Sequence, residues 1–150
     1  MANTAAFSGH RNLKDTGFDS GLLERVIREL INNGTKTFLC GMAVGFDLSA
    51  AETVLSYKEK EEIKLIACLP CPNQSERYSS ANKLLYEKIL NSCDEVVTVC
   101  PEYTNGCMFE RDRYLVDNSD LLVCFLRKNR GGTFYTVNYA RKKGKKIIEL

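Results

Sequence analysis

The sequence contains no tryptophan, three prolines and a single histidine, His10, among its 150 residues. One histidine excludes a zinc site built on several histidines. No apolar run approaches the roughly 20 residues that cross a bilayer. The first four residues are neither basic nor strongly apolar, so we expect no signal peptide, no membrane association and a cytoplasmic location. Hydrophobic residues make up 44% and charged residues 27%, a globular balance, and the length predicts one domain over residues 1–150.

The seven cysteines are an odd number, and most lie in or beside apolar runs, where cysteine packs as a small hydrophobe. A disulfide scaffold is normally shorter and secreted. Cys68 and Cys71 have CxxC spacing, but no second pair follows them. We therefore expect reduced thiols, no bound metal and no cofactor, with a redox or metal role of Cys68 and Cys71 left open.

The net charge of +2 indicates no particular partner. Basic residues gather from Arg127 onward, where Glu149 is the only acidic residue. Such a cluster can meet phosphate groups or nucleic acid, but Lys and Arg also favour the last turn of a helix. For Arg141–Lys146 we favour the solvated helix end, so a nucleic-acid partner is not expected.

Apolar residues at helical spacing alternate with short apolar runs along the whole chain. The expected strands are 5–7, 37–40, 64–69, 95–100, 120–126 and 145–150, and the expected helices are 22–32, 47–60, 80–91, 108–118 and 131–143. Strict alternation of this kind predicts an α/β fold, a single-domain Rossmann-like three-layer sandwich with a mainly parallel sheet.

Three segments that follow strands are suited to binding anions: Ser8-Gly9-His10-Arg11, Gly41 to Asp47, and Gly131-Gly132-Thr133. Ligands of open parallel sheets bind beyond the carboxyl ends of the strands. Glycine lets a phosphate approach the backbone, and a helix N-terminus offers unpaired N–H groups. Asp47 is expected either to be a helix N-cap or to bind a ribose hydroxyl.

Neither of the common nucleotide-binding fingerprints is present. Gly45 is followed by Phe46-Asp47 rather than by Gly-Lys-Ser/Thr, so there is no Walker A motif, and Gly41-x3-Gly45 is not the GxGxxG turn. A P-loop NTPase and a standard NAD dehydrogenase are therefore not expected.

Four motifs follow one another in order: Ser8–Arg11, Gly41–Asp47, Met108-x2-Arg111-x2-Tyr114 to Asp120, and Gly131-Gly132-Thr133-x2-Thr136-Val137-x-Tyr139-Ala140. Together they resemble the YpsA-like group of the SLOG superfamily, over about residues 5 to 150. That superfamily also includes the Lonely-guy nucleoside-monophosphate phosphoribohydrolases, the DNA-processing protein A group and sensors of nucleotide-derived signals. The resemblance implies a Rossmann-like fold with a nucleotide-type pocket.

The resemblance places Gly131, Gly132 and Thr133 at the phosphate loop of the Lonely-guy hydrolases, and Arg111 at their catalytic-site arginine. Those hydrolases carry a glutamate shortly after the loop, whereas residues 135–138 here are not acidic. Asp112 is a second departure, because the YpsA-like pattern has asparagine there. Both differences argue against hydrolase activity and leave the phosphate loop intact.

Ligand contacts are predicted for one set of residues: Ser8, Gly9, His10, Arg11, Gly41, Met42, Ala43, Gly45, Phe46, Asp47, Pro70, Gln74, Arg111, Gly131, Gly132 and Thr133. If the protein is an enzyme, His10 and Arg111 are the expected catalytic residues, since His10 titrates near neutrality. Tyr78 and Tyr103 either stack on a base or pack in loops.

The favoured function is binding of a nucleotide-derived small molecule by a sensor or sequestering protein, with a phage-defence signal among the candidates. The alternatives are N-glycosidic hydrolysis of a nucleoside monophosphate, with Glu110 or Asp47 as the carboxylate, and binding of single-stranded nucleic acid. The resemblance also implies a homodimer or larger homo-oligomer, for which the helices around 48–57 and 108–115 are the candidate contacts.

Overall fold

One six-stranded sheet runs through the computed structural model, which describes residues 3–150. The strand order is β4-β3-β2-β1-β5-β6, and every neighbouring pair is parallel. The strands are β1 (Thr4–Gly9), β2 (Thr37–Cys40), β3 (Lys64–Leu69), β4 (Glu95–Thr98), β5 (Leu121–Phe125) and β6 (Lys146–Glu149). The expected α/β sandwich is confirmed, and the sheet is parallel throughout rather than mainly parallel.

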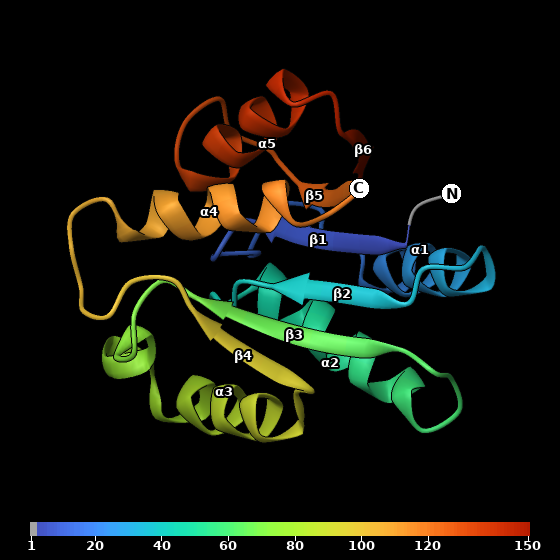
Figure 1. The fold of residues 1–150 in the computed structure, drawn as a ribbon, viewed down its shortest axis with the longest axis horizontal. Coiled ribbons are helices and arrows are strands. Elements are labelled where there is room, and N and C mark those ends of the chain that lie inside the picture. Colours follow the sequence, from blue (N-terminus) through green and yellow to red (C-terminus); the bar gives the residue numbers. More distant parts are fainter. Residues whose placement is uncertain (1–2) are drawn as a thin grey trace.

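Five α-helices connect the strands and cover the two faces of the sheet (Figure 1). They are α1 (Ser20–Asn32), α2 (Phe46–Lys58), α3 (Ser80–Ser92), α4 (Cys107–Asp117) and α5 (Gly132–Lys142), and a short 3-10 helix, η1 (Gln74–Arg77), precedes α3. Helices α1, α2 and α3 pack together on one face, and α4 packs against α5 on the other. This arrangement follows from right-handed crossovers between parallel strands, which change face where the strand order reverses.

The strand order reverses between β1 and β5, the two central strands. All residues of β5 are buried, and Gly9 at the end of β1 pairs in register with Phe125 at the end of β5. The loops that follow these two strands therefore leave the sheet side by side. Such a switch point is where open α/β sheets place their ligands.

Alternate residues of the central strands supply two cores, as period-2 strand geometry requires. Phe7 and Phe38 belong to the core beneath α1–α3, where their rings stack at 5.9 Å, together with Phe46 and Phe125. Ala6 and Leu122 belong to the core beneath α4 and α5. Burial on both faces explains the near-continuous apolar run of β5 in the sequence.

Element boundaries agree with the sequence to within a few residues, but one local expectation is wrong. The residue that caps the N-terminus of α2 is Gly45, and Asp47 lies inside the first turn instead of being the N-cap. The side chain of Asp19, at the start of α1, does act as an N-cap by accepting a hydrogen bond from the Gly21 N–H at 2.9 Å. Helix η1 falls in a loop for which the sequence predicts no helix.

Three further findings concern residues 3–150. No helix there has the length and apolar character that a membrane crossing needs. The seven cysteines are all free, and all but Cys93 are buried. No group of three or more His, Cys, Asp or Glu side chains within this part of the chain is arranged to hold a metal ion.

Candidate functional site

A pocket of about 670 Å³ opens at the carboxyl ends of β1 and β5. We call it the strand-end pocket. It lies between the loops after β1 and β5, the first turn of α2 and the first half of α4. Its lining residues are Phe7, Ser8, Gly9, His10, Arg11, Asn12, Ala43, Asp47, Asn105, Met108, Phe109, Arg111, Asp112, Leu115, Lys128, Arg130, Gly131, Gly132 and Thr133.

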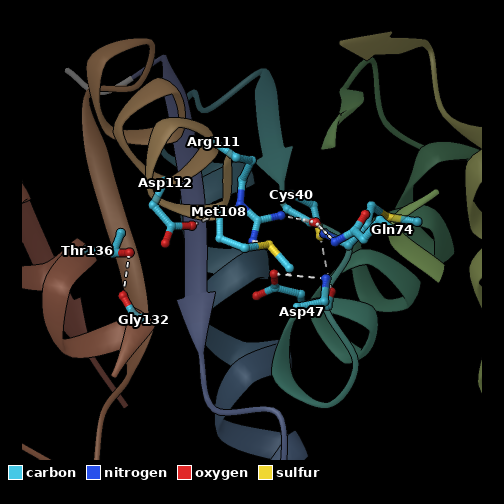
Figure 2. Close-up of polar contacts among 11 residues, drawn as sticks. Cys40, Asp47, Gln74, Met108, Arg111, Asp112, Gly132 and Thr136 are labelled. Carbon is cyan, nitrogen blue, oxygen red and sulfur yellow. Dashed lines mark hydrogen bonds and ion pairs between the residues drawn. The ribbon is translucent and has the colours of Figure 1, made fainter. Parts of the chain in front are cut away.

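The side chain of Arg111 reaches from α4 across the strand ends (Figure 2) and is only 6% exposed. Its Nε donates to the Asp112 carboxylate at 2.9 Å, and its Nη1 donates to the carbonyl oxygen of Gly41. Burial lowers the pKa of Arg111, but the neighbouring charges of Asp112 and Asp47 raise it by more, so the guanidinium stays charged. Arg111 therefore ties α4 to the end of β2 and places a fixed positive charge in the pocket wall.

Asp47 is a buried carboxylate with one unpartnered oxygen. Its Oδ2 accepts a hydrogen bond from the Ala43 N–H at 3.2 Å, whereas its buried Oδ1 has no hydrogen-bond partner in the described structure. Burial raises the pKa of Asp47 from 3.8 to about 7, against the opposing charge of Arg111. Near neutral pH this side chain can therefore carry or release a proton at the pocket wall.

Asp112 forms the other side of the Arg111 ion pair. Its side chain is 11% exposed, and burial raises its pKa although the charge of Arg111 opposes the shift. The side chain of Thr136, on the facing helix α5, lies beside it and donates to the Gly132 carbonyl at 2.8 Å (Figure 2). Asp112 thus lies between the α4 arginine and the start of α5.

His10 has a structural hydrogen bond within the pocket rim. Its Nε2 accepts from the Arg127 backbone N–H at 2.7 Å, which joins the loops after β1 and β5. Burial and the charges of Lys128 and Arg127 lower the pKa of His10, so the imidazole is neutral at pH 7. With Nε2 occupied, only Nδ1 remains for a ligand.

The two glycine-bearing helix starts differ in their access to the pocket. At the start of α2, Phe46 N–H donates to the His10 carbonyl at 3.2 Å, and a Cβ on Gly45 would lie 2.2 Å from the Arg11 carbonyl oxygen. The backbone of residues 10 and 11 therefore blocks an anion from reaching the start of α2. The Asp47 carboxylate, in the first turn of this helix, also disfavours an anion there.

The start of α5 is open. Gly131 has φ of +92°, and a Cβ built on it would meet nothing within 4 Å. Gly132 is equally uncrowded, since its nearest neighbour would be an Asp112 oxygen at 3.8 Å. The first N–H groups of an α-helix have no partner inside the helix. Gly131, Gly132 and Thr133 at the start of α5 line the pocket, and no side chain within the described part of the chain caps this helix start, where the helix dipole favours an anion.

Three exposed cations line the same pocket: Arg11, Lys128 and Arg130. None of their side chains forms an ion pair or a hydrogen bond with any residue in the 3–150 range. Unpaired cations beside open backbone N–H groups can bind a phosphate by charge-assisted hydrogen bonds.

Of the residues predicted to contact a ligand, most line the strand-end pocket: Ser8, Gly9, His10, Arg11, Ala43, Asp47, Arg111, Gly131, Gly132 and Thr133. The others have structural positions. Met42 and Phe46 are fully buried core side chains, and Gly45 supports the turn described above. Gly41 is required for packing, because a Cβ there would lie 2.8 Å from the Arg111 guanidinium.

Gln74 and Pro70 also lie outside the strand-end pocket. The Gln74 Nε2 donates to the Gly41 carbonyl at 2.8 Å, and its Oε1 accepts from the Tyr86 hydroxyl at 3.1 Å. Both ends of the amide are therefore used inside the fold. Pro70 ends β3, and its carbonyl accepts from the Cys100 N–H at 3.0 Å.

Nine lining residues are absent from the sequence-based prediction: Phe7, Asn12, Asn105, Met108, Phe109, Asp112, Leu115, Lys128 and Arg130. Lys128 and Arg130 lie just before Gly131 in the sequence. Their place in the pocket could therefore have been predicted from their position in the chain. Met108 and Asp112 lie one helical turn before and one residue after Arg111, and their inclusion depends on the rotation of α4, which the sequence does not specify.

The sequence is similar to one protein family and to several bacterial proteins. A family model, YpsA, described as the YspA SLOG family, matches residues 18–148. The chain is 31% identical over 131 residues to the SPbeta prophage-derived protein YoqJ of Bacillus subtilis, covering 78% of this chain and 77% of that one. It is 28% identical over 117 residues to a UPF0398 protein of Listeria monocytogenes, covering 75% and 65%.

Solved structures share the fold at low identity. DNA processing protein A from Streptococcus pneumoniae superposes with a TM-score of 0.71 at 21% identity, covering 97% of this chain and 49% of that one. The molybdenum cofactor carrier protein of Chlamydomonas reinhardtii gives a TM-score of 0.60 at 14% identity, covering 99% and 76%. The chain thus spans about half the length of the pneumococcal protein, and both likenesses concern the fold alone.

Proposed function

Because the chain belongs to the YspA SLOG family, we propose that it binds the phosphate of a nucleotide-derived small molecule in the strand-end pocket. In this role it is a sensor or a sequestering protein. The observation that carries the proposal is the open start of α5, with Gly131 and Gly132 uncrowded and three unpaired cations lining the same pocket. The prophage origin of one relative supports a ligand that serves as a defence signal.

Each side of the pocket has a part in this proposal. The N–H groups at Gly132 and Thr133 hold phosphate oxygens, while Lys128 and Arg130 neutralise their charge. Arg111 already donates hydrogen bonds to Asp112 and to the Gly41 carbonyl. It therefore contributes a positive electrostatic potential at a fixed position more than a contact that adapts to the ligand. Asp47 Oδ1, which lacks a partner, accepts from a ribose hydroxyl when the carboxylate is ionised and donates to an oxygen when it is protonated.

Ligand binding is expected to raise the stability of the native protein. At a concentration 100 times the Kd, the free energy of unfolding should increase by about 2.7 kcal/mol. Denaturation midpoints measured with ribose 5-phosphate, nucleoside monophosphates, cyclic nucleotides and ADP-ribose test this. Lys128→Ala should weaken binding roughly tenfold or more, since a charge-assisted hydrogen bond contributes about 1.5–3 kcal/mol.

Lys142→Ala is the matched control, because Lys142 is equally exposed but lies in the last turn of α5, away from the pocket. It should leave every midpoint shift unchanged. A panel in which no phosphate compound shifts the midpoint would contradict the proposal. So would equal losses in the two lysine variants.

Hydrolysis of an N-glycosidic bond is the second candidate, and one observation favours it: Asp47 lies in the pocket with a pKa of about 7. Glu110, the other candidate carboxylate, is exposed and accepts from the Cys100 thiol at 2.8 Å. Chromatography of the same incubations for free base separates the two functions. Base released by the unaltered protein but not by Asp47→Asn would replace simple binding by catalysis.

A homodimer that completes the pocket is also part of the proposal. The apolar side chains of α2 are buried in the core of the same chain, so α2 offers little to a second copy. Phe109 on α4 is 43% exposed and lines the pocket, which makes the α4 side the better contact. Size exclusion with light scattering should give a dimer that Phe109→Glu dissociates. A strict monomer of about 16.9 kDa, with and without ligand, would contradict it.

A further inference from the structure

A second pocket of about 630 Å³ adjoins the first. We call it the tyrosine pocket, after Tyr78 and Tyr103. Its lining comes mainly from the loop after β3, η1 and the start of α3: Arg11, Ala43, Val44, Cys71, Asn73, Gln74, Glu76, Arg77, Tyr78, Ser79, Asn82, Tyr103 and Met108. Arg11, Ala43 and Met108 line both pockets, so the two cavities meet at these residues.

The tyrosine pocket has the chemistry that a flat aromatic ring needs. Ala43, Val44 and Met108 provide apolar contact, and two tyrosines provide aromatic surface. Tyr78 is held in place, because its hydroxyl donates to the Met42 carbonyl at 3.0 Å and its ring packs edge-on against Tyr86 at 5.6 Å. A side chain fixed in this way provides a preformed wall.

Tyr103 differs from Tyr78 in its exposure and in its hydrogen bonding. It is 62% exposed, and its hydroxyl forms no hydrogen bond within residues 3–150. The Asn82 amide is likewise without a side-chain hydrogen bond in the described chain, so it can pair with the polar edge of a ring. The amides of Gln74 and Asn73 are already used, the latter on Glu76 at 3.1 Å. The pocket therefore offers one exposed ring and one free amide.

Arg11 connects the two pockets electrostatically. Its charge acts on Asp47 and Asp112 in the strand-end pocket and on Tyr78 in the tyrosine pocket. The guanidinium is exposed and makes no hydrogen bond to any residue in the described range. A ligand that crosses from one pocket to the other would thus pass a free guanidinium, which favours an anionic group at the crossing.

We propose that the tyrosine pocket holds the base of a nucleotide whose phosphate chain passes Arg11 and ends at the start of α5. The ligand class is then a nucleoside diphosphate or a larger nucleotide, in which base and terminal phosphate occupy different pockets. This inference rests on the proposed function, because it assumes a phosphate at α5. It adds the second pocket and names Tyr103 and Asn82 as the residues that recognise the base.

Calorimetric titration with two kinds of probe tests the inference. Ribose 5-phosphate has a phosphate and no base, while ADP, GDP, CDP and UDP have both. We expect at least one nucleoside diphosphate to bind more tightly than ribose 5-phosphate. Tyr103→Ala should weaken that nucleotide about tenfold to a hundredfold, the effect typical of a lost base–aromatic stack, and leave ribose 5-phosphate unchanged.

Tyr103→Phe is the matched control, since it keeps the ring and should keep the nucleotide affinity. Three results would overturn the inference while leaving the proposed function intact. They are nucleotides that bind no better than ribose 5-phosphate, a Tyr103→Ala variant with unchanged nucleotide affinity, and a variant that loses both kinds of probe equally. No binding by any probe would instead contradict the proposed function itself.

Discussion

Replacement of Arg111 by methionine is expected to lower the free energy of unfolding by about 3–5 kcal/mol at pH 7, the usual cost of removing one partner from a buried ion pair. The substitution keeps an unbranched apolar stem but leaves Asp112 without its 2.9 Å ion pair and removes the main opposing charge from Asp47. It also leaves the Gly41 carbonyl with Gln74 as its remaining side-chain donor. Equilibrium unfolding in urea measures the loss.

Arg113→Met provides the control on the same helix. Arg113 is partly exposed, and its side chain donates only to the Tyr135 hydroxyl at 2.8 Å, so its loss should cost under about 1 kcal/mol. The Arg111→Met deficit should also shrink toward pH 5, where the two carboxylates bind protons. Equal losses in the two variants, or a deficit that does not change with pH, would contradict this account of Arg111.

The Asp47→Asn substitution is expected to stabilise the protein increasingly as the pH rises. Because burial raises the pKa of Asp47 from 3.8 to about 7, the native state binds a proton that the unfolded state has lost between these values. The contribution of Asp47 to stability therefore falls as the pH rises from about 4 to about 7. Asparagine has no such titration and can still accept the hydrogen bond from the Ala43 N–H.

At about 1.4 kcal/mol per pKa unit, the advantage of Asp47→Asn should be roughly 2–3 kcal/mol larger at pH 8 than at pH 5. Urea unfolding of both proteins at several pH values gives this difference directly. Asp15→Asn, the same change of carboxylate to amide in an exposed loop, is the control. A constant difference between Asp47→Asn and the unaltered protein would show that Asp47 is ionised in the native state throughout this range.

Much of the fold could be predicted from the sequence, because its signals are local. Apolar spacing and stop residues placed α1 and β5 to within a few positions, and alternation of elements indicated a parallel sheet. The approximate place of the strand-end pocket also followed, since loops after parallel strands meet at one edge. These predictions required only spacing along the chain.

The roles of individual residues could not be predicted in the same way. Glycine at positions 9, 41, 45 and 131 looks the same in the sequence, yet a Cβ on Gly9 would lie 2.3 Å from the Phe46 ring, whereas one on Gly131 would meet nothing. Residues 110–113 are all charged, a pattern that in the sequence alone is equally typical of a solvated turn. The rotation of α4 instead buries Arg111 and Asp112, and such rotation is set by packing against distant strands.

Strand order also determines when each part of this sheet can form during synthesis. Strand β1 is made first but is central, with β2 on one side and β5 on the other. The Thr4 N–H donates to the Asp120 carboxylate, 116 residues further along the chain. The β1–β4 half can assemble on the ribosome as it emerges, but one edge of β1 must wait for β5. Until then that edge has unpaired backbone groups, so the nascent chain is most exposed to wrong strand pairing just before β5 and the loop that follows it are made.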